Sequence, residues 1–204
     1  MTSLSEISLL TAVNLLCKRD SSLQSVVDHF GPPPLWSREP GFATLIHIIL
    51  EQQVSLASAQ ACFDKLNARL PILNPAEFLR LKDQDLLAFG FSRQKTRYAR
   101  ILARSILEGH LDLNNLEHLS DADVFSRLTA LTGIGPWTAN IYLLMALGRP
   151  DIWPTGDLAL VVAVQNLYDL DHRPQEAEFL QRGESWRPYR AVAARILWHY
   201  YLSR

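Results

Sequence analysis

The sequence predicts an all-α protein. Apolar residues recur at helical spacing, as in Leu45, Ile46, Ile49 and Leu50, and no stretch shows the strict apolar–polar alternation of a half-buried strand. Polar capping residues and glycine or proline divide the chain into short segments. With 204 residues, of which 48% are hydrophobic and 20% charged, the chain can bury a substantial core.

The first half contains several helix start and stop signals. Ser3 and Glu6 have the spacing of a capping box, and the glycine–proline run 31–34 ends helical structure. Asn74 precedes a first-turn proline, and Gly90 suits a C-terminal cap. We therefore expect a helix after residue 6 and helical segments over 42–52, 55–66, 74–90 and 92–109.

The second half repeats this pattern. Ser120 is expected to cap a helix that ends near Ala130, and Pro136 suits the first position of the next helix. Pro150 and Pro154 require a loop. Further helices are expected over 136–147, 157–168, 174–181 and from 188 onwards, which gives roughly ten helices in total.

The charge balance does not by itself indicate a nucleic-acid-binding protein. Twenty lysines and arginines oppose 21 acids, for a formal net charge of −1, whereas phosphate-binding domains are often strongly basic. Local clusters count more than the sum, however. One basic stretch, without acids, holds Arg93, Lys95, Arg97, Arg100 and Arg104, and a second holds Arg182, Arg187, Arg190 and Arg195, interrupted by Glu184.

Two cysteines limit the covalent and metal chemistry that this chain can support. Cys17 and Cys62 lie beside apolar neighbours, so we expect buried free thiols rather than a disulfide scaffold or a four-cysteine metal site. No secretory leader pattern is visible, and the longest apolar run, 141–147, is far too short to cross a membrane. We therefore expect an intracellular protein.

A Gly-x-Gly turn separates two of the predicted helices. Gly133 and Gly135 allow positive φ and close backbone approach, and the N–H groups that start the following helix could hold a phosphate. A tight turn packed in a core explains the same residues, and on the pattern alone it is the more frequent case.

The wider context resembles the helix-hairpin-helix DNA glycosylase superfamily, which includes endonuclease III. The resemblance is carried by the hairpin 131–139 (LTGIGPWTA), by an aspartate after a proline-containing loop at 153–157 (WPTGD), and by the segment 50–55 (LEQQVS). The segment 186–190 (WRPYR) with Trp198 is similar to the alkylation-repair branch, DNA-3-methyladenine glycosylase II. These matches lie in the family's order over roughly residues 36–202.

Two departures from the wider superfamily define the expected subtype. Trp137 stands where bifunctional members carry a Schiff-base lysine, which implies a monofunctional enzyme without lyase activity. The chain has too few cysteines for the family's iron–sulfur cluster, and its length leaves no room for the N-terminal β-domain of some relatives. The resemblance therefore implies the compact form, with no cofactor for the chemistry.

Asp157 aligns with the family's catalytic carboxylate. A carboxylate against C1′ stabilises the oxocarbenium character of the transition state and can orient or deprotonate the attacking water. The position also suits an ordinary N-cap for the helix after it, and both roles can hold at once.

The resemblance also implies an aromatic pocket for a damaged base. Alkylated purines of the 3-methyladenine and 7-methylguanine type carry positive charge, so electron-rich rings can select them by stacking and cation–π attraction. Trp137 and Trp198 occupy pocket positions, and Trp36 and Tyr142 are weaker candidates, while core packing is the common alternative for each. Two further pocket positions hold Ile141 and Leu158 rather than aromatic residues.

The remaining residues implied by the resemblance would contact duplex DNA. A flipped base leaves a hole in the stack, and the Gln52–Gln53 turn would fill it, with Gln53 as the wedge, although an exposed polar helix end is the alternative. The hairpin 133–135 would hold a phosphate, and the carbonyls of Thr129, Leu131 and Ile134 would bind a monovalent cation, Na⁺ or K⁺. Phosphate contacts are also expected from Gly133, Ile134, Gly135, Arg93, Lys95 and Arg97.

The expected architecture has two helical domains with a DNA-binding cleft between them. One domain would span 41–149 and carry the hairpin, and the other would join 1–40 to 150–204 and carry Asp157. Asp157, Trp137 and Trp198 should then converge on one water-poor slot. We expect a monomer that acts in base excision repair, cytoplasmic in a bacterium or nuclear in a eukaryote.

Three other interpretations remain open at this point. The chain could be a non-catalytic helix-hairpin-helix DNA-binding protein, or a glycosylase for another lesion such as uracil, hypoxanthine or oxidised guanine. It could also be a helical interaction domain without a role on DNA.

Overall fold

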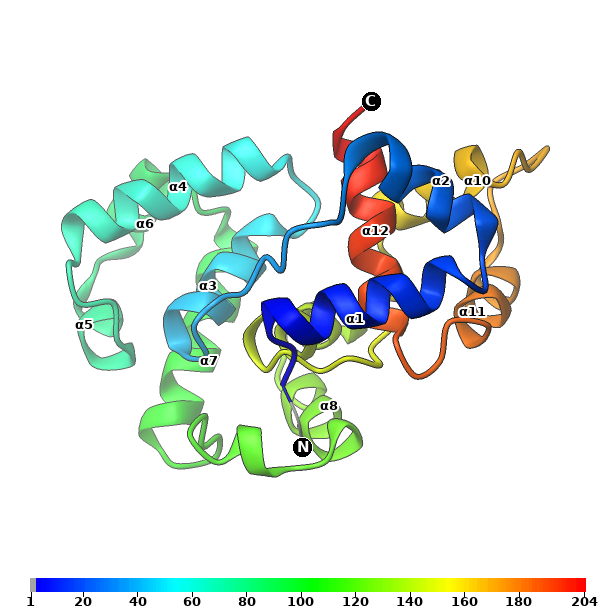
Figure 1. The fold of residues 1–204 in the computed structure, drawn as a ribbon. Helices are drawn as coiled ribbons and strands as arrows, with labels where there is room; N and C mark the ends of the chain where they lie inside the picture. Colours follow the sequence, from blue (N-terminus) through cyan, green and yellow to red (C-terminus); the bar gives the residue numbers. More distant parts are fainter. Residues whose placement is uncertain (1–2) are drawn as a thin grey trace. The chain divides into compact units, whose positions relative to one another are not determined.

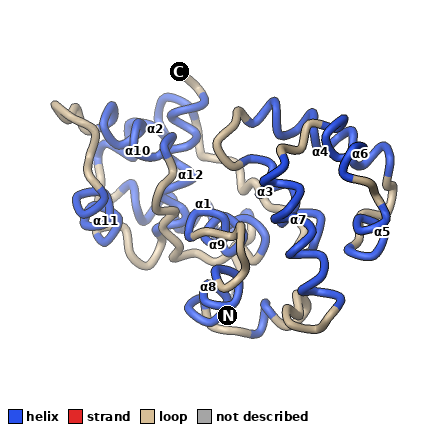
Figure 2. Tube along the Cα trace, turned by 180° about the vertical axis from the view of Figure 1, so that it is seen from behind, coloured by secondary structure: helices blue, strands red, loops and turns tan. Residues whose placement is uncertain are grey.

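A computed structural model describes residues 3–204 and shows the expected all-α fold. Within this range there are twelve α-helices, two short helical turns and no strand. Figure 2 shows the helices in blue and the loops that join them in tan. None of the helices described is long and apolar enough to cross a membrane. Cys17 and Cys62 are both buried free thiols, as predicted.

The chain divides into two compact units. Unit 1 joins residues 1–37 to 143–204, and unit 2 is the continuous stretch 38–142. The sequence placed these boundaries at 41 and 149, several residues further along the chain. One contact of the segment after 142 with the rest of unit 1 is the hydrogen bond from the N–H of Leu4 to the carbonyl of Gly148, at 2.8 Å.

Unit 1 is built around its last helix. In Figure 1, α12 lies beside α1 and α2, and α10 also packs on it. The face of α12 that meets them is apolar, with Val192, Ile196 and Leu197 fully buried. The helices of this unit are α1 (Glu6–Cys17), α2 (Ser21–Phe30), α10 (Leu158–Leu167), α11 (Glu176–Glu184) and α12 (Arg190–Leu202).

Unit 2 is built around α3, which packs against α4, α7 and α9. Leu45, Ile46 and Ile49 are fully buried in it, so the helical spacing read from the sequence does mark a core face. The elements are α3 (Phe42–Glu51), α4 (Leu56–Arg69), α5 (Pro75–Arg80), α6 (Asp83–Phe89), α7 (Arg93–Leu107), the 3₁₀ turn η1 (Leu116–His118), α8 (Asp121–Thr129) and α9 (Pro136–Ile141).

The chain passes from unit 2 to unit 1 inside a single turn of π-helix, η2 (Tyr142–Ala146), which continues α9. The sequence predicted one helix over 136–147, and the structure keeps this segment helical while widening its last turn. Such π-turns are uncommon and often lie near functional sites.

Candidate active site

Asp157 is the N-cap of α10 and is almost completely buried, with 8% of its surface exposed. Its Oδ1 accepts hydrogen bonds from the backbone N–H of Leu160 at 2.9 Å and from the indole Nε1–H of Trp198 at 3.2 Å. The capping role weighed from the sequence is therefore present. The second bond is not part of a cap, because it joins the start of α10 to α12.

The loop before Asp157 delivers the carboxylate to this buried position. Gly156 has a φ of +81°, a left-handed conformation that glycine adopts without the steric cost of a Cβ. The N–H of Asp157 also donates to the carbonyl of Pro154 at 3.4 Å, which closes the turn. A carboxylate fixed in a dry setting can stabilise a nearby positive charge more strongly than one in water.

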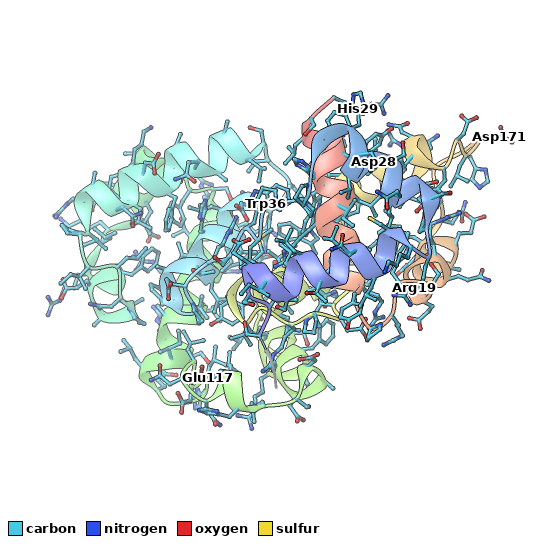
Figure 3. The ribbon with its side chains drawn as sticks, in the orientation of Figure 1. Arg19, Asp28, His29, Trp36, Glu117 and Asp171 are labelled. Carbon is cyan, nitrogen blue, oxygen red and sulfur yellow. The ribbon has the colours of Figure 1, made fainter. Side chains whose placement is uncertain are left out.

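Two aromatic candidates of unit 1 lie at the same end of α12. Trp198 is 7% exposed, and His199, the next residue, meets the ring of Trp36 edge-on at 6.4 Å between centroids. Trp36 lies on the loop after α2 (Figure 3), half-buried and in a left-handed conformation with φ of +47°. That conformation is unusual for a residue with a side chain and persists where neighbours determine it.

Arg195 holds the Trp36 loop against α12. Its guanidinium, 1% exposed, donates to the carbonyls of Leu35, Ala191 and Leu144 at 2.8, 3.0 and 2.9 Å. Burial lowers the pKa of this guanidinium to about 10. Arg195 belongs to the second basic stretch of the sequence, but its side chain is buried and joins three backbone carbonyls inside unit 1.

Most of the rest of that basic stretch is paired with acids. Arg187 and Arg190 both bind Asp151, at 2.7 and 2.9 Å, and both bind Glu184, at 2.6 and 3.0 Å. Arg182 lies over the ring of Tyr168 at 4.1 Å. This face of unit 1 therefore offers less uncompensated positive charge than a count of arginines suggests.

The glycine hairpin lies in unit 2, between α8 and α9. Gly133 has a φ of +98°, and a Cβ there would lie 2.1 Å from Cγ of Tyr98, so both conformation and space require glycine. Gly135, by contrast, is exposed, has an ordinary φ and has nothing within 4 Å of the place of a Cβ. It caps α9, with Pro136 at the first helical position.

The Gln52–Gln53 turn gives its two glutamines different roles. The Nε2 of Gln52 donates to the carbonyl of Gly133 and to Oγ1 of Thr138, both at 2.9 Å. Gln53 is exposed and has a φ of +56°. The turn and the hairpin are thus brought together, with Gln52 facing inwards and Gln53 presented to solvent.

The three basic candidates on α7 also differ. Arg93 and Arg97 are exposed. Lys95 is partly buried, and its Nζ donates to the carbonyl of Leu50 at 2.6 Å, at the end of α3. Burial lowers the pKa of this lysine. The structure therefore uses the ammonium of Lys95 as a cap for α3, which a count of charges along the sequence could not reveal.

The aromatic candidates of unit 2 are placed differently as well. Trp137 lies in the first turn of α9 and is partly exposed. Tyr142 is fully buried, and its hydroxyl oxygen accepts from the N–H of Gly41 at 3.1 Å. Burial raises the pKa of this phenol to about 12. A ring without exposed surface cannot stack on a ligand in this conformation, so Tyr142 has the core role weighed for it from the sequence.

The carbonyls predicted to bind a cation belong to the hairpin segment. Thr129 ends α8, and the carbonyl of Leu131 accepts from the N–H of Ile134 at 3.0 Å, which leaves its second lone pair for another partner. Neutral carbonyl oxygens are suitable ligands for alkali cations. Within residues 3–204, no group of three or more His, Cys, Asp or Glu side chains is arranged to hold a metal ion.

Comparison with known proteins identifies the family. The sequence pattern of the HhH-GPD superfamily of base excision DNA repair proteins matches residues 46–188. This match covers most of the chain and includes the hairpin and Asp157. The chain therefore belongs to the HhH-GPD superfamily of base excision DNA repair proteins.

Individual relatives place the chain within that superfamily. It is 29% identical to YfjP of Bacillus subtilis strain 168, provisionally named a DNA-3-methyladenine glycosylase, over 88% of this chain and 69% of the relative. It is 28% identical to DNA-3-methyladenine glycosylase 1 of Schizosaccharomyces pombe, over 86% of this chain and 79% of that one.

A solved structure supports the same placement. The Schizosaccharomyces pombe 3-methyladenine DNA glycosylase Mag1, crystallised in complex with abasic DNA, is 27% identical to this chain. Its structure superposes with a TM-score of 0.86 over 92% of this chain and 95% of Mag1. The resemblance read from the sequence, to the alkylation-repair branch with its helix-hairpin-helix fold, is confirmed.

Proposed function

We propose that this protein is a monofunctional DNA glycosylase of base excision repair that hydrolyses the N-glycosidic bond of alkylated purines. The observation that carries the proposal is the buried carboxylate of Asp157, oriented through one oxygen by both the start of α10 and the indole of Trp198. Two relatives that match most of this chain are named DNA-3-methyladenine glycosylases, one of them provisionally.

Asp157 is the catalytic carboxylate in this scheme. The bond between C1′ and the purine nitrogen breaks, and its electron pair leaves with the base. The sugar gains positive charge, which the carboxylate stabilises. A water oxygen then bonds to C1′, and its proton passes to the carboxylate or to solvent, which leaves an abasic site.

Positively charged purines of the 3-methyladenine and 7-methylguanine type are the substrates that this chemistry suits. Their charge makes the base a good leaving group. A single carboxylate is therefore enough to catalyse cleavage, and a strong general acid is not needed. Trp198 and Trp36, both of unit 1, are the indoles that would stack on the flipped base. Trp137 stays a candidate for the same role. The fully buried Tyr142 is left out of this set.

Duplex DNA containing a damaged base is the proposed partner. The exposed backbone at Gly135, with Gly133 and Ile134, would bind a phosphate, and Arg93 and Arg97 would add phosphate contacts. Gln53 would enter the space left by the flipped base. A monovalent cation on the carbonyls of Thr129, Leu131 and Ile134 would add positive charge beside that phosphate.

A monofunctional reaction follows from Trp137, because an indole cannot form the Schiff base that β-elimination needs. The enzyme would act as a monomer, in the cytoplasm of a bacterium or the nucleus of a eukaryote, where the DNA is.

An excision assay on methylated duplex DNA tests the proposal. Wild type should release free alkylated purines and leave intact strands that break only after alkali treatment. Asp157→Asn keeps the capping oxygen but loses the charge, so its rate should fall by about 100- to 10,000-fold. If wild type releases no base from any duplex in a panel that also holds uracil, hypoxanthine and oxidised guanine, the proposed activity is wrong.

A further inference from the structure

Three consecutive residues at the end of α3 are each held by a side chain from another part of unit 2. The carbonyl of Leu50 accepts from Nζ of Lys95 at 2.6 Å. The carboxylate of Glu51, 7% exposed, accepts two hydrogen bonds from the guanidinium of Arg38, at 3.1 and 2.7 Å. Gln52 completes the series with its bonds to the hairpin.

The bonds of Gln52 reach both arms of the hairpin. Gly133 is the left-handed residue of the turn, and Thr138, 1% exposed, lies inside α9. A primary amide carries two N–H groups on one nitrogen, so both bonds can form at the same time. Loss of this amide would leave the buried hydroxyl of Thr138 and the carbonyl of Gly133 without that donor, which is unfavourable.

Gln53 is the next residue, and its backbone is in a conformation that it would not adopt by itself. A φ of +56° is uncommon for a residue with a side chain, and such a conformation persists where the surrounding structure determines it. The contacts of residues 50–52 hold the backbone of Gln53 in this conformation. The exposed side chain of Gln53 is therefore presented from a fixed position.

We propose that Gln52 is a positioning residue for base extrusion, because its amide joins the turn that carries Gln53 to the glycine hairpin. The inference rests on the proposed function, and it gives a physical route by which phosphate binding aids flipping. When the hairpin binds a DNA phosphate, the amide of Gln52 holds Gln53 at a fixed position beside the base stack. The energy of phosphate binding can then be used to extrude the base.

The test compares two duplexes that differ in whether the damaged base is paired. One carries 7-methylguanine opposite cytosine, and the other carries it opposite an abasic-site analogue, where extrusion is already easier. Gln52→Met keeps the length of the side chain but removes its donor. Single-turnover release from the paired duplex should fall by about 10- to 100-fold, with a much smaller fall on the unpaired one. Equal losses on the two duplexes, or no loss, would overturn the proposal.

A second variant keeps the test valid if Gln52→Met folds poorly. Thr138→Val removes one of the two acceptors while preserving shape, so it should cause a smaller loss of the same kind. The double variant should be no slower than Gln52→Met, since the shared bond is already gone. Gln24→Met is the matched control, because it removes an amide that bonds Asp28 at 2.6 Å on α2 of unit 1. Its release rates should equal those of wild type.

Hydrogen exchange supplies a measurement that does not need activity. In Gln52→Met, amides of residues 50–56 and 131–138 should exchange faster than in wild type, whereas α12 should not change. Unchanged exchange in both segments would contradict the positioning role. If wild type releases no base at all, the proposed function fails, and the exchange result still decides whether Gln52 fixes the turn.

Discussion

A single hydrogen bond distinguishes Asp157 from an ordinary helix cap. Its Oδ1 meets a backbone N–H of α10, as many capping aspartates do, but it also meets the indole Nε1–H of Trp198 on α12. The indole therefore has two tasks, to form one wall of the proposed base pocket and to fix the direction of the carboxylate. Small errors in that direction are costly when the carboxylate must face one carbon atom.

Replacement of Trp198 by phenylalanine separates these two tasks. The ring remains apolar and large, but the donor to Asp157 is lost, and removing one partner of a buried hydrogen bond costs about 1–3 kcal/mol. We expect excision to slow by about 10-fold or more under single-turnover conditions. Trp186→Phe is the control, because it removes an indole donor to Asp20 at 3.0 Å. A similar slowing in Trp186→Phe would mean that the Trp198 effect is general destabilisation.

These residues could be picked out from the sequence, but the groups that their side chains contact could not. Asp157 was predicted both as a cap and as the acid, since its position after a proline loop and before an apolar helix is visible in one dimension. Lys95 was predicted to contact phosphate and Arg195 was counted in a basic stretch, and both side chains are instead bound to carbonyls far away in the sequence. No local pattern reveals such a contact, because it depends on which segments the fold brings together.

At the scale of elements, helix ends were predicted where the signal is local. Asn74 and Ser120 cap α5 and α8 as expected. Two details were missed. Ser5, paired with Ser8, caps α1 in place of Ser3, and the segment 74–90 is broken at Leu81, after which Asp85 accepts from the N–H of Lys82 at 3.0 Å. The first error arises where two serines could cap the same helix. The second arises because the backbone at Leu81 is extended, with its carbonyl bound by Arg100 at 2.7 Å, a contact that no local pattern shows.

The two glycines of the hairpin should respond differently to substitution, because the fold requires glycine at Gly133 but not at Gly135. Gly133→Ala introduces a Cβ at positive φ and against the ring of Tyr98. We expect a loss of about 1–3 kcal/mol in the free energy of unfolding. Gly135→Ala has an allowed φ and open space, so its stability should stay within about 0.5 kcal/mol of wild type. Thermal or urea unfolding of both variants measures the difference, and equal losses would contradict this account.

For the whole molecule, the near-zero net charge becomes compatible with DNA binding once charge pairs are assigned. Arg187 and Arg190 are neutralised by Asp151 and Glu184, whereas Arg93 and Arg97 of unit 2 are exposed. The family and fold class were predicted correctly from motif order. The unit boundaries differ by a few residues because they depend on contacts between segments far apart in the sequence, such as Leu4 with Gly148.

The salt dependence of DNA affinity tests this distribution. Each lost phosphate contact lowers the slope of log affinity against log salt by about 1. We therefore expect Arg97→Ala to reduce the slope, and Arg190→Ala to leave it unchanged because that side chain is held by acids. Lys95→Met should also leave the slope unchanged, since its ammonium caps α3. A lower slope in Arg190→Ala would show that the ion pairs open on DNA.

The discontinuous make-up of unit 1 has a consequence for synthesis on the ribosome. Unit 2 is one uninterrupted stretch and can fold once residue 142 has left the exit tunnel. Helices α1 and α2, which precede unit 2 in the chain, pack on α12, which follows it. The apolar faces of α1 and α2 therefore stay exposed to water until α12 has been made, and during this interval the nascent chain is open to aggregation and to chaperones.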